Sequence, residues 1–258
     1  MSPVLEARPA VVAAMALAAL ATTLGPVAVA AWWARRTRVP VSVALWGAVV
    51  FVVSQVVLRL PWQIPLGVWL GPRIKGHWAL GVAWIAASAL TAGLFEETGR
   101  WAGYRWLVKR ERTFRVGVMF GIGHGGVESM LLVGLNLGVS AVLYVLFASG
   151  HAPAMPPEAA SKVVEALSAL HPVDLLAATL ERAMALTFHV AASLLVLQCF
   201  TRGSKRWLAG AVLLHFATDF VGVEGALQLK RWGSLAAEAA VVPSFVVAVW
   251  LIGRARRW

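Results

Sequence analysis

A succession of long apolar segments constrains the fold of this chain more than any other feature. A helix needs roughly 20 consecutive apolar residues to cross a lipid bilayer, and several of these segments approach or exceed that length. Of the 258 residues, 60% are hydrophobic and only 14% are charged, which is well below the charge of an average soluble domain. The segments are apolar on all sides, whereas the strands of a membrane β-barrel alternate polar and apolar residues. The sequence therefore predicts an all-α, polytopic membrane protein.

About seven membrane-spanning helices are expected, in a single domain that takes in residues 1–258. The fourth apolar segment continues through 138–149, and a broken or re-entrant segment there would raise the number to eight. The first segment is longer than the apolar part of a secretion signal, roughly 7–15 residues, and is interpreted as a retained helix. A short amphipathic helix is expected at 156–170, either as an ordinary loop helix or at the membrane surface. The predicted spans are 10–34, 40–58, 77–108, 114–137, 172–200, 206–222 and 235–253.

The net charge of +11 comes from short basic clusters between the apolar segments. No basic face is left that would bind nucleic acid, so no nucleic-acid partner is expected. Lys and Arg accumulate in the cytoplasmic loops of membrane proteins. With the N-terminus outside, thirteen of these residues fall on the cytoplasmic side and seven on the other. The distribution predicts that the C-terminus lies in the cytoplasm. A bacterial-type inner or plasma membrane is the expected location.

Four of the predicted spans contain ionisable side chains, which cost several kcal/mol at membrane depth unless they pair or take part in chemistry. Several of them are four residues apart and therefore share one helix face. From the helical rise, the central ones lie roughly 13–20 Å from the basic cluster of their own helix. This common depth predicts one buried site that faces the cytoplasm. Its residues are Glu96, Glu97, Arg100, His124, Glu128, Glu181, His189, His215 and Asp219.

Two kinds of hydrolytic chemistry suit these residues. In the first, Glu96 or Glu97 acts with His124 to activate water for attack on a peptide carbonyl, and His215 donates to the oxyanion. The glycines around His124 would then let an extended substrate chain come close. In the second, zinc is bound, although the chain has no His-Glu-x-x-His motif. The candidate zinc ligands are His124, His189 and His215, with Asp219 or Glu128.

Two other interpretations stay open at this point. The same residues suit a proton or ion relay in a proton-coupled transporter, although no internal repeat of the kind found in many transporters is visible. A transporter predicts substrate flux that depends on these carboxylates, without proteolysis. Alternatively, the charges only hold the helices together. Such a scaffold predicts that function survives the replacement of both Glu96 and Glu97 by Gln.

Taken together, these motifs resemble those of the CAAX-prenyl-protease and bacteriocin-processing superfamily of intramembrane proteases. The shared motifs are Glu-Glu-x-x-Arg at 96–100, Phe-x-x-x-His at 120–124 and His-x-x-x-Asp at 215–219. The YhfC-type branch is most similar, through Gly-His-Gly-Gly-x-Glu at 123–128, Glu-Arg at 181–182 and His189. The resemblance covers about residues 77–222, over half of the chain.

The resemblance implies a glutamate-dependent endopeptidase that acts on a peptide or protein substrate in or near the membrane, with the lipid bilayer as its surroundings. No cofactor is implied by that mechanism, and zinc is the alternative because the superfamily was long described as metal-dependent. Glu96 or Glu97 with His124 would activate water, and His215 with residue 219 would form the oxyanion site.

Two departures from the superfamily pattern affect how these residue roles apply to this chain. Two residues separate the glutamate pair from Arg100, where three are commoner, so the spacing does not say which glutamate faces the site. Position 219 is Asp, where the prenyl-protease relatives have Asn. An ionised carboxylate cannot donate to an oxyanion. Asp219 is therefore expected to orient His215 or a metal.

Overall fold

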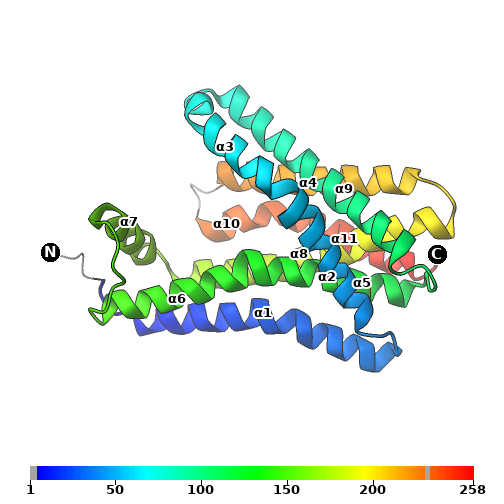
Figure 1. Ribbon diagram of the computed structural model, residues 1–258, viewed down its shortest axis with the longest axis horizontal. Coiled ribbons are helices and arrows are strands. Elements are labelled where there is room, and N and C mark those ends of the chain that lie inside the picture. The colour runs from blue at the N-terminus through cyan, green and yellow to red at the C-terminus, as the bar shows by residue number, and fades with distance from the viewer. Residues whose placement is uncertain (1–4, 230–232) are drawn as a thin grey trace.

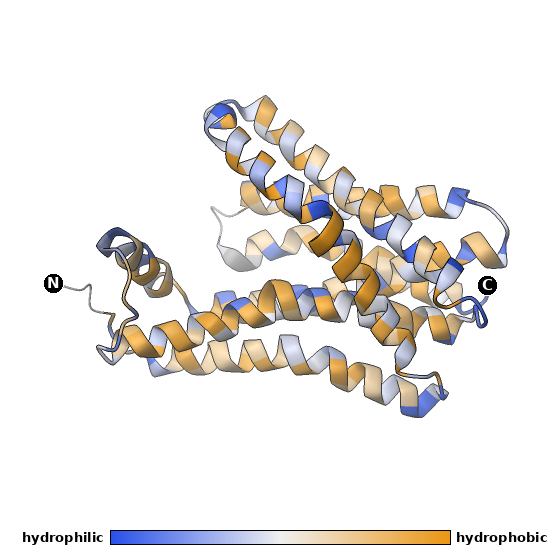
Figure 2. Ribbon diagram, viewed as in Figure 1, coloured by the Kyte–Doolittle hydropathy of each residue, from blue (hydrophilic) through white to orange (hydrophobic). Residues whose placement is uncertain are grey.

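The computed structural model describes residues 5–229 and 233–258, and this part of the chain is helical and contains no strand. Seven segments are long and apolar enough to cross a membrane, which confirms the predicted class and the predicted number of spans. Figures 1 and 2 show a bundle of long helices with apolar residues along their lengths. The seven segments are Pro9–Thr37, Ser42–Ile74, Trp78–Trp106, Phe114–Ala148, Pro172–Thr201, Arg206–Leu229 and Ala236–Ala255.

The second span is longer than predicted because it continues through a π-helical turn. Helix α2 (Ser42–Phe51), the π-helix Val52–Arg59 and α3 (Leu60–Ile74) form one continuous segment. Arg59 lies inside it and is only 9% exposed, so the predicted end of this span at residue 58 was wrong. Prolines within α3 made this stretch look like a loop. Membrane helices tolerate proline because neighbouring groups satisfy the freed backbone atoms.

The fourth span also contains a π-helical turn. Helix α5 (Phe114–Ser129), the π-helix Met130–Gly134 and α6 (Leu135–Ala148) are continuous. The described residues therefore contain no re-entrant segment at 138–149 and no eighth span. The remaining spans are built from α1 (Pro9–Thr37), α4 (Trp78–Trp106), α8 (Pro172–Thr201), α9 (Arg206–Leu229), α10 (Ser234–Glu238), a short 3₁₀ turn (Ala239–Val241) and α11 (Val242–Ala255).

The amphipathic segment forms helix α7 (Pro157–Ser168), which packs its apolar side against the bundle. Ala160 and Leu167 share a small hydrophobic core with Met15, Tyr144 and Phe147. This core lies at the end of the bundle where α1 begins and α6 ends, away from the basic loops. The charge count that predicted the orientation also used Lys230 and Arg231, which lie outside the described residues, so the orientation stays a prediction.

The larger hydrophobic core fills the end of the bundle next to the basic loops. Tyr104, Met119 and Phe120 are fully buried there together with residues of α2, α8 and α11. At the rim, the guanidinium of Arg202 lies 5.3 Å from the Trp207 ring, as expected for a cation over an aromatic face. Along each helix, this apolar packing separates the ionisable residues from the basic loops.

The glycines around His124 allow helices to pack closely, and they are not available to a substrate. A Cβ atom at Gly123 would lie 1.9 Å from the carbonyl oxygen of Ala44, far inside van der Waals contact. Small residues at such positions let the backbones of membrane helices approach one another. The expectation that they admit a substrate chain was therefore wrong. The same holds for all four glycines near His124. An added Cβ atom would contact Val190 at Gly121, Ala44 at Gly123, His189 at Gly125 and Pro26 at Gly126.

Candidate active site

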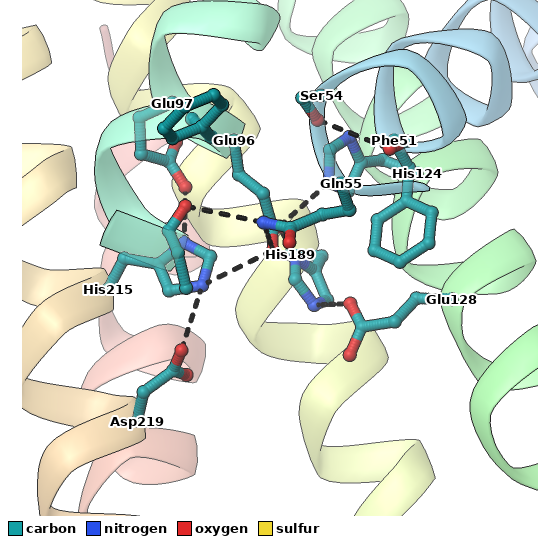
Figure 3. A network of polar contacts seen from close by, with 12 residues as sticks. Phe51, Ser54, Gln55, Glu96, Glu97, His124, Glu128, His189, His215 and Asp219 are labelled. Atoms are coloured by element: carbon teal, nitrogen blue, oxygen red, sulfur yellow. Dashed lines mark hydrogen bonds and ion pairs between the residues drawn. The ribbon is translucent and has the colours of Figure 1, made fainter. Parts of the chain in front are cut away.

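The predicted site residues come together in one polar cluster between the helices; Figure 3 labels all of them except Arg100 and Glu181. Their side chains form a connected set of hydrogen bonds and ion pairs. The cluster is built from Glu96, Glu97 and Arg100 on α4, His124 and Glu128 on α5, Glu181 and His189 on α8, and His215 and Asp219 on α9.

Glu97 is the completely buried member of the glutamate pair. It forms an ion pair with Arg100, which is also completely buried. Its Oε1 atom also lies 2.6 Å from Nδ1 of His215. Glu97 therefore compensates the Arg100 charge and fixes the His215 ring through its Nδ1 atom.

Glu96 is the member of the pair that lines the cavity, and it is 5% exposed. Its Oε2 atom lies 2.9 Å from Nε2 of His124 and 3.4 Å from Nη2 of Arg100. Its Oε1 atom accepts a hydrogen bond of 2.7 Å from the side-chain amide of Gln55. His124 is completely buried behind Glu96, so the carboxylate, and not the imidazole, reaches the cavity wall.

His189 lies between a cation and a carboxylate. Nη2 of Arg100 donates to its Nδ1 atom over 2.5 Å, and its Nε2 atom pairs with Glu128. Because arginine can only donate, these contacts assign the ring proton to Nε2. Arg182 in turn lies 3.1 Å from Glu128 and also pairs with Glu181. This second group of charges extends the cluster along α8.

His215 is held by carboxylates at both ring nitrogens. Besides the Nδ1 contact with Glu97, its Nε2 atom lies 3.5 Å from Oδ2 of Asp219, one turn further along α9. The Asp219 side chain is 34% exposed and lines the cavity. This arrangement agrees with the expectation that Asp219 orients His215.

A cavity of about 850 Å³ adjoins the cluster. Its wall includes Glu96, Glu128, His189, His215 and Asp219, and continues along Trp84, Met184 and Leu227. The last three lie toward the helix ends that face away from the basic loops. The cavity therefore extends away from those loops. Which compartment it faces depends on the orientation, so the cytoplasm-facing site stays a prediction. The residue depths were measured from the basic loops, and depth alone does not tell in which direction a cavity runs.

Two site residues were missed in the sequence. Gln55 and Arg59 line the same cavity from the π-helix between α2 and α3. Both are polar, they are four residues apart, and they stand at the end of an apolar run. The four-residue spacing also identified the other pairs. It was overlooked here because the predicted span ended at residue 58, which placed Arg59 in a loop.

The donor set next to the cavity fits a divalent metal. One oxygen of Glu96 and one nitrogen each of His124 and His189 lie within 4.8 Å of one another. One carboxylate and two imidazoles form a common catalytic zinc set. The set differs from the predicted one, because His215 is held by Glu97 and Asp219, and Glu128 pairs with His189. Arg100 would have to turn away from Nδ1 of His189 for all three residues to bind one ion.

The fold and the cluster define a polytopic membrane protein with a buried site of charged and polar side chains beside a cavity. The sequence matches the YhfC intramembrane metalloprotease family over residues 21–242, and the chain belongs to that family. It is 31% identical over 136 residues to the uncharacterized membrane protein YhfC of Bacillus subtilis (strain 168). The alignment takes in 49% of this chain and 51% of the relative, so it spans about half of each. No solved structure matches.

Proposed function

We propose that this protein is an intramembrane endopeptidase in which Glu96, supported by His124, activates water for attack on a peptide bond. The observation that carries the proposal is the Glu96 carboxylate on the cavity wall, with His124 2.9 Å from one oxygen and Gln55 2.7 Å from the other. Membership of a family described as intramembrane metalloproteases supports proteolysis in the membrane as the activity. The substrate would be a peptide or protein that is associated with the membrane or delivered to it.

The chemistry follows from the positions of these groups. Each carboxylate oxygen has two lone pairs, so Glu96 keeps one free for a water in the cavity. As the water oxygen bonds to the peptide carbon, Glu96 takes its proton and then delivers it to the departing amine. Nε2 of His215, which lines the cavity, would donate to the developing oxyanion. Glu97 on Nδ1 and Asp219 beside Nε2 would hold the ring for that task.

A zinc-dependent form of the same activity is favoured by the compact Glu96, His124 and His189 set. Bound there, zinc would polarise the peptide carbonyl and provide hydroxide near neutral pH. Glu128 would orient His189 through its other ring nitrogen. Such outer partners of a metal-binding histidine fix its orientation.

Metal analysis of variants tests this ligand set. In the zinc-dependent form, zinc bound by the purified protein is expected to fall from about one ion per chain to none in His124→Ala/His189→Ala. His215→Ala should retain it, since His215 belongs to the Glu97 and Asp219 contacts. The double variant His151→Ala/His171→Ala, in exposed loops, serves as the control. Zinc that survives in His124→Ala/His189→Ala would contradict the assignment.

The proteolytic activity itself is tested with membrane-associated peptides. The purified protein in lipid nanodiscs is expected to produce new peptide termini, and His124→Ala should slow their formation by about 100-fold or more. His151→Ala, which removes an exposed imidazole, should cleave like the wild type. Equal rates for His124→Ala and the wild type would rule out the proposed role of this histidine.

A further inference from the structure

The π-helix between α2 and α3 brings two polar side chains to the site from outside the four motif-bearing helices. Gln55 is 3% exposed and Arg59 is 9% exposed. The backbone N–H of Leu60 donates to the carbonyl of Gln55, five residues earlier, which is the π-helical pattern. π-Helical segments within α-helices are rare and occur frequently at functional sites. Gln55 and Arg59 both lie on this π-helix, so a functional role for it would be carried by their contacts.

The two side chains form a directed chain of hydrogen bonds that ends on Glu96. Nη1 of Arg59 donates to Oε1 of Gln55 over 2.7 Å, and Nε2 of Gln55 donates to Oε1 of Glu96 over 2.7 Å. Because arginine has no acceptor atom, the Gln55 oxygen must face Arg59 and its NH₂ group must face Glu96. The orientation of the amide is thus fixed from both sides (Figure 3 shows the Gln55 end).

Arg59 is itself fastened to the helix that carries Glu96. Nη2 of Arg59 donates to the carbonyl of Ser88 over 2.7 Å, and Nε lies 3.3 Å from Oγ1 of Thr91. Both partners belong to α4, so the π-helix and α4 are tied together just before Glu96. The consequence for Glu96 is that Oε1 is held in place while Oε2 faces His124.

If these contacts only joined two helices, they would stabilise the fold less than apolar packing would. All three partners of Arg59 are neutral oxygens, and a buried cation without a close carboxylate is usually less stable than a well-packed apolar side chain. A reacting group, in contrast, must be held by neighbours whose own conformations are locked. We propose that Gln55 and Arg59 are positioning residues that fix the Glu96 carboxylate for reaction, an inference that rests on the proposed function of Glu96.

The expected effect separates positioning from binding. Gln55→Leu removes the donor to Oε1 and lets Glu96 turn away from His124, so kcat should fall about 10–100-fold, as for other outer-shell partners, while KM stays unchanged. Arg59→Met should lower kcat through Gln55. The matched control is Gln198→Leu on α8, a buried glutamine that also accepts from an arginine four residues later (Arg202), far from Glu96.

Infrared spectroscopy of the full-length protein tests the contact without needing a substrate. The difference between the wild type and Glu96→Gln identifies the Glu96 carboxyl band. Gln55→Leu and Arg59→Met are each expected to shift this band, and Gln198→Leu should leave it in place. Because Arg59 acts through Gln55, the double variant should match Gln55→Leu, which is the non-additivity expected of a connected chain.

The possible outcomes separate this inference from the proposed function. An unmoved band in Gln55→Leu would overturn the positioning pair whatever the cleavage results. A double variant that shifts further than Gln55→Leu would overturn the route from Arg59 through Gln55. A shifted band with unchanged kcat would overturn the positioning role. A shifted band in a protein that cleaves no peptide would support the contact while the proposed function fails.

Discussion

Glu96→Gln is expected to slow peptide cleavage by about 10²–10⁴-fold, the contribution of a well-placed general base. Glutamine has the same size and still accepts the Gln55 hydrogen bond, but it cannot take the proton from water. Glu96 is the glutamate of the pair that reaches the cavity wall. The measurement is the initial cleavage rate of the purified protein in lipid nanodiscs.

The control for this prediction is Glu165→Gln, which removes the same charge from an exposed position on α7. It should cleave at the wild-type rate. Thermal unfolding of both variants shows whether the chain is still folded. A folded Glu96→Gln protein with wild-type activity would exclude Glu96 as the base.

Arg100→Met should destabilise the fold by about 3–5 kcal/mol, the usual cost of removing one partner from a buried ion pair. Arg100 and Glu97 are both completely buried, so the substitution leaves the Glu97 charge without its cation. The free energy of unfolding in detergent, measured by denaturant titration, reports the loss. Arg105→Met, at an exposed position in the last turn of the same helix, should change it by no more than about 0.5 kcal/mol.

A double-mutant cycle shows whether the loss comes from this pair. Adding Glu97→Gln to Arg100→Met removes the isolated charge and should recover part of the lost stability. Glu97→Gln alone should be destabilising. Residues in contact deviate from additivity in this way. Strictly additive losses would show that the two charges do not stabilise each other.

The sequence was sufficient for the fold class because bilayer thickness sets the length of every span. The same reasoning failed between 59 and 74, where an arginine and several prolines look like a loop. Contacts from α4 are what make Arg59 tolerable inside a helix, since Ser88 and Thr91 satisfy its donors. Such contacts between distant segments are not visible in a single apolar pattern.

The candidate site was predictable as a cluster because residues four apart share a helix face and four helices place them at one depth. The choice between Glu96 and Glu97 was not, because adjacent residues point in different directions and only the packing of α4 decides which one faces the cavity. The direction of the cavity depends likewise on the large core around Tyr104 and Phe120. That core forms from several helices together.

Cleavage in water enriched in ¹⁸O tests the central claim most directly. The purified wild-type protein is incubated with membrane-associated peptides, and the new C-termini are analysed by mass spectrometry. The account predicts that each new carboxylate carries one oxygen from water and that Glu96→Gln yields almost none of these products. A folded wild-type protein that yields no new termini, or termini formed equally by Glu96→Gln, would contradict it.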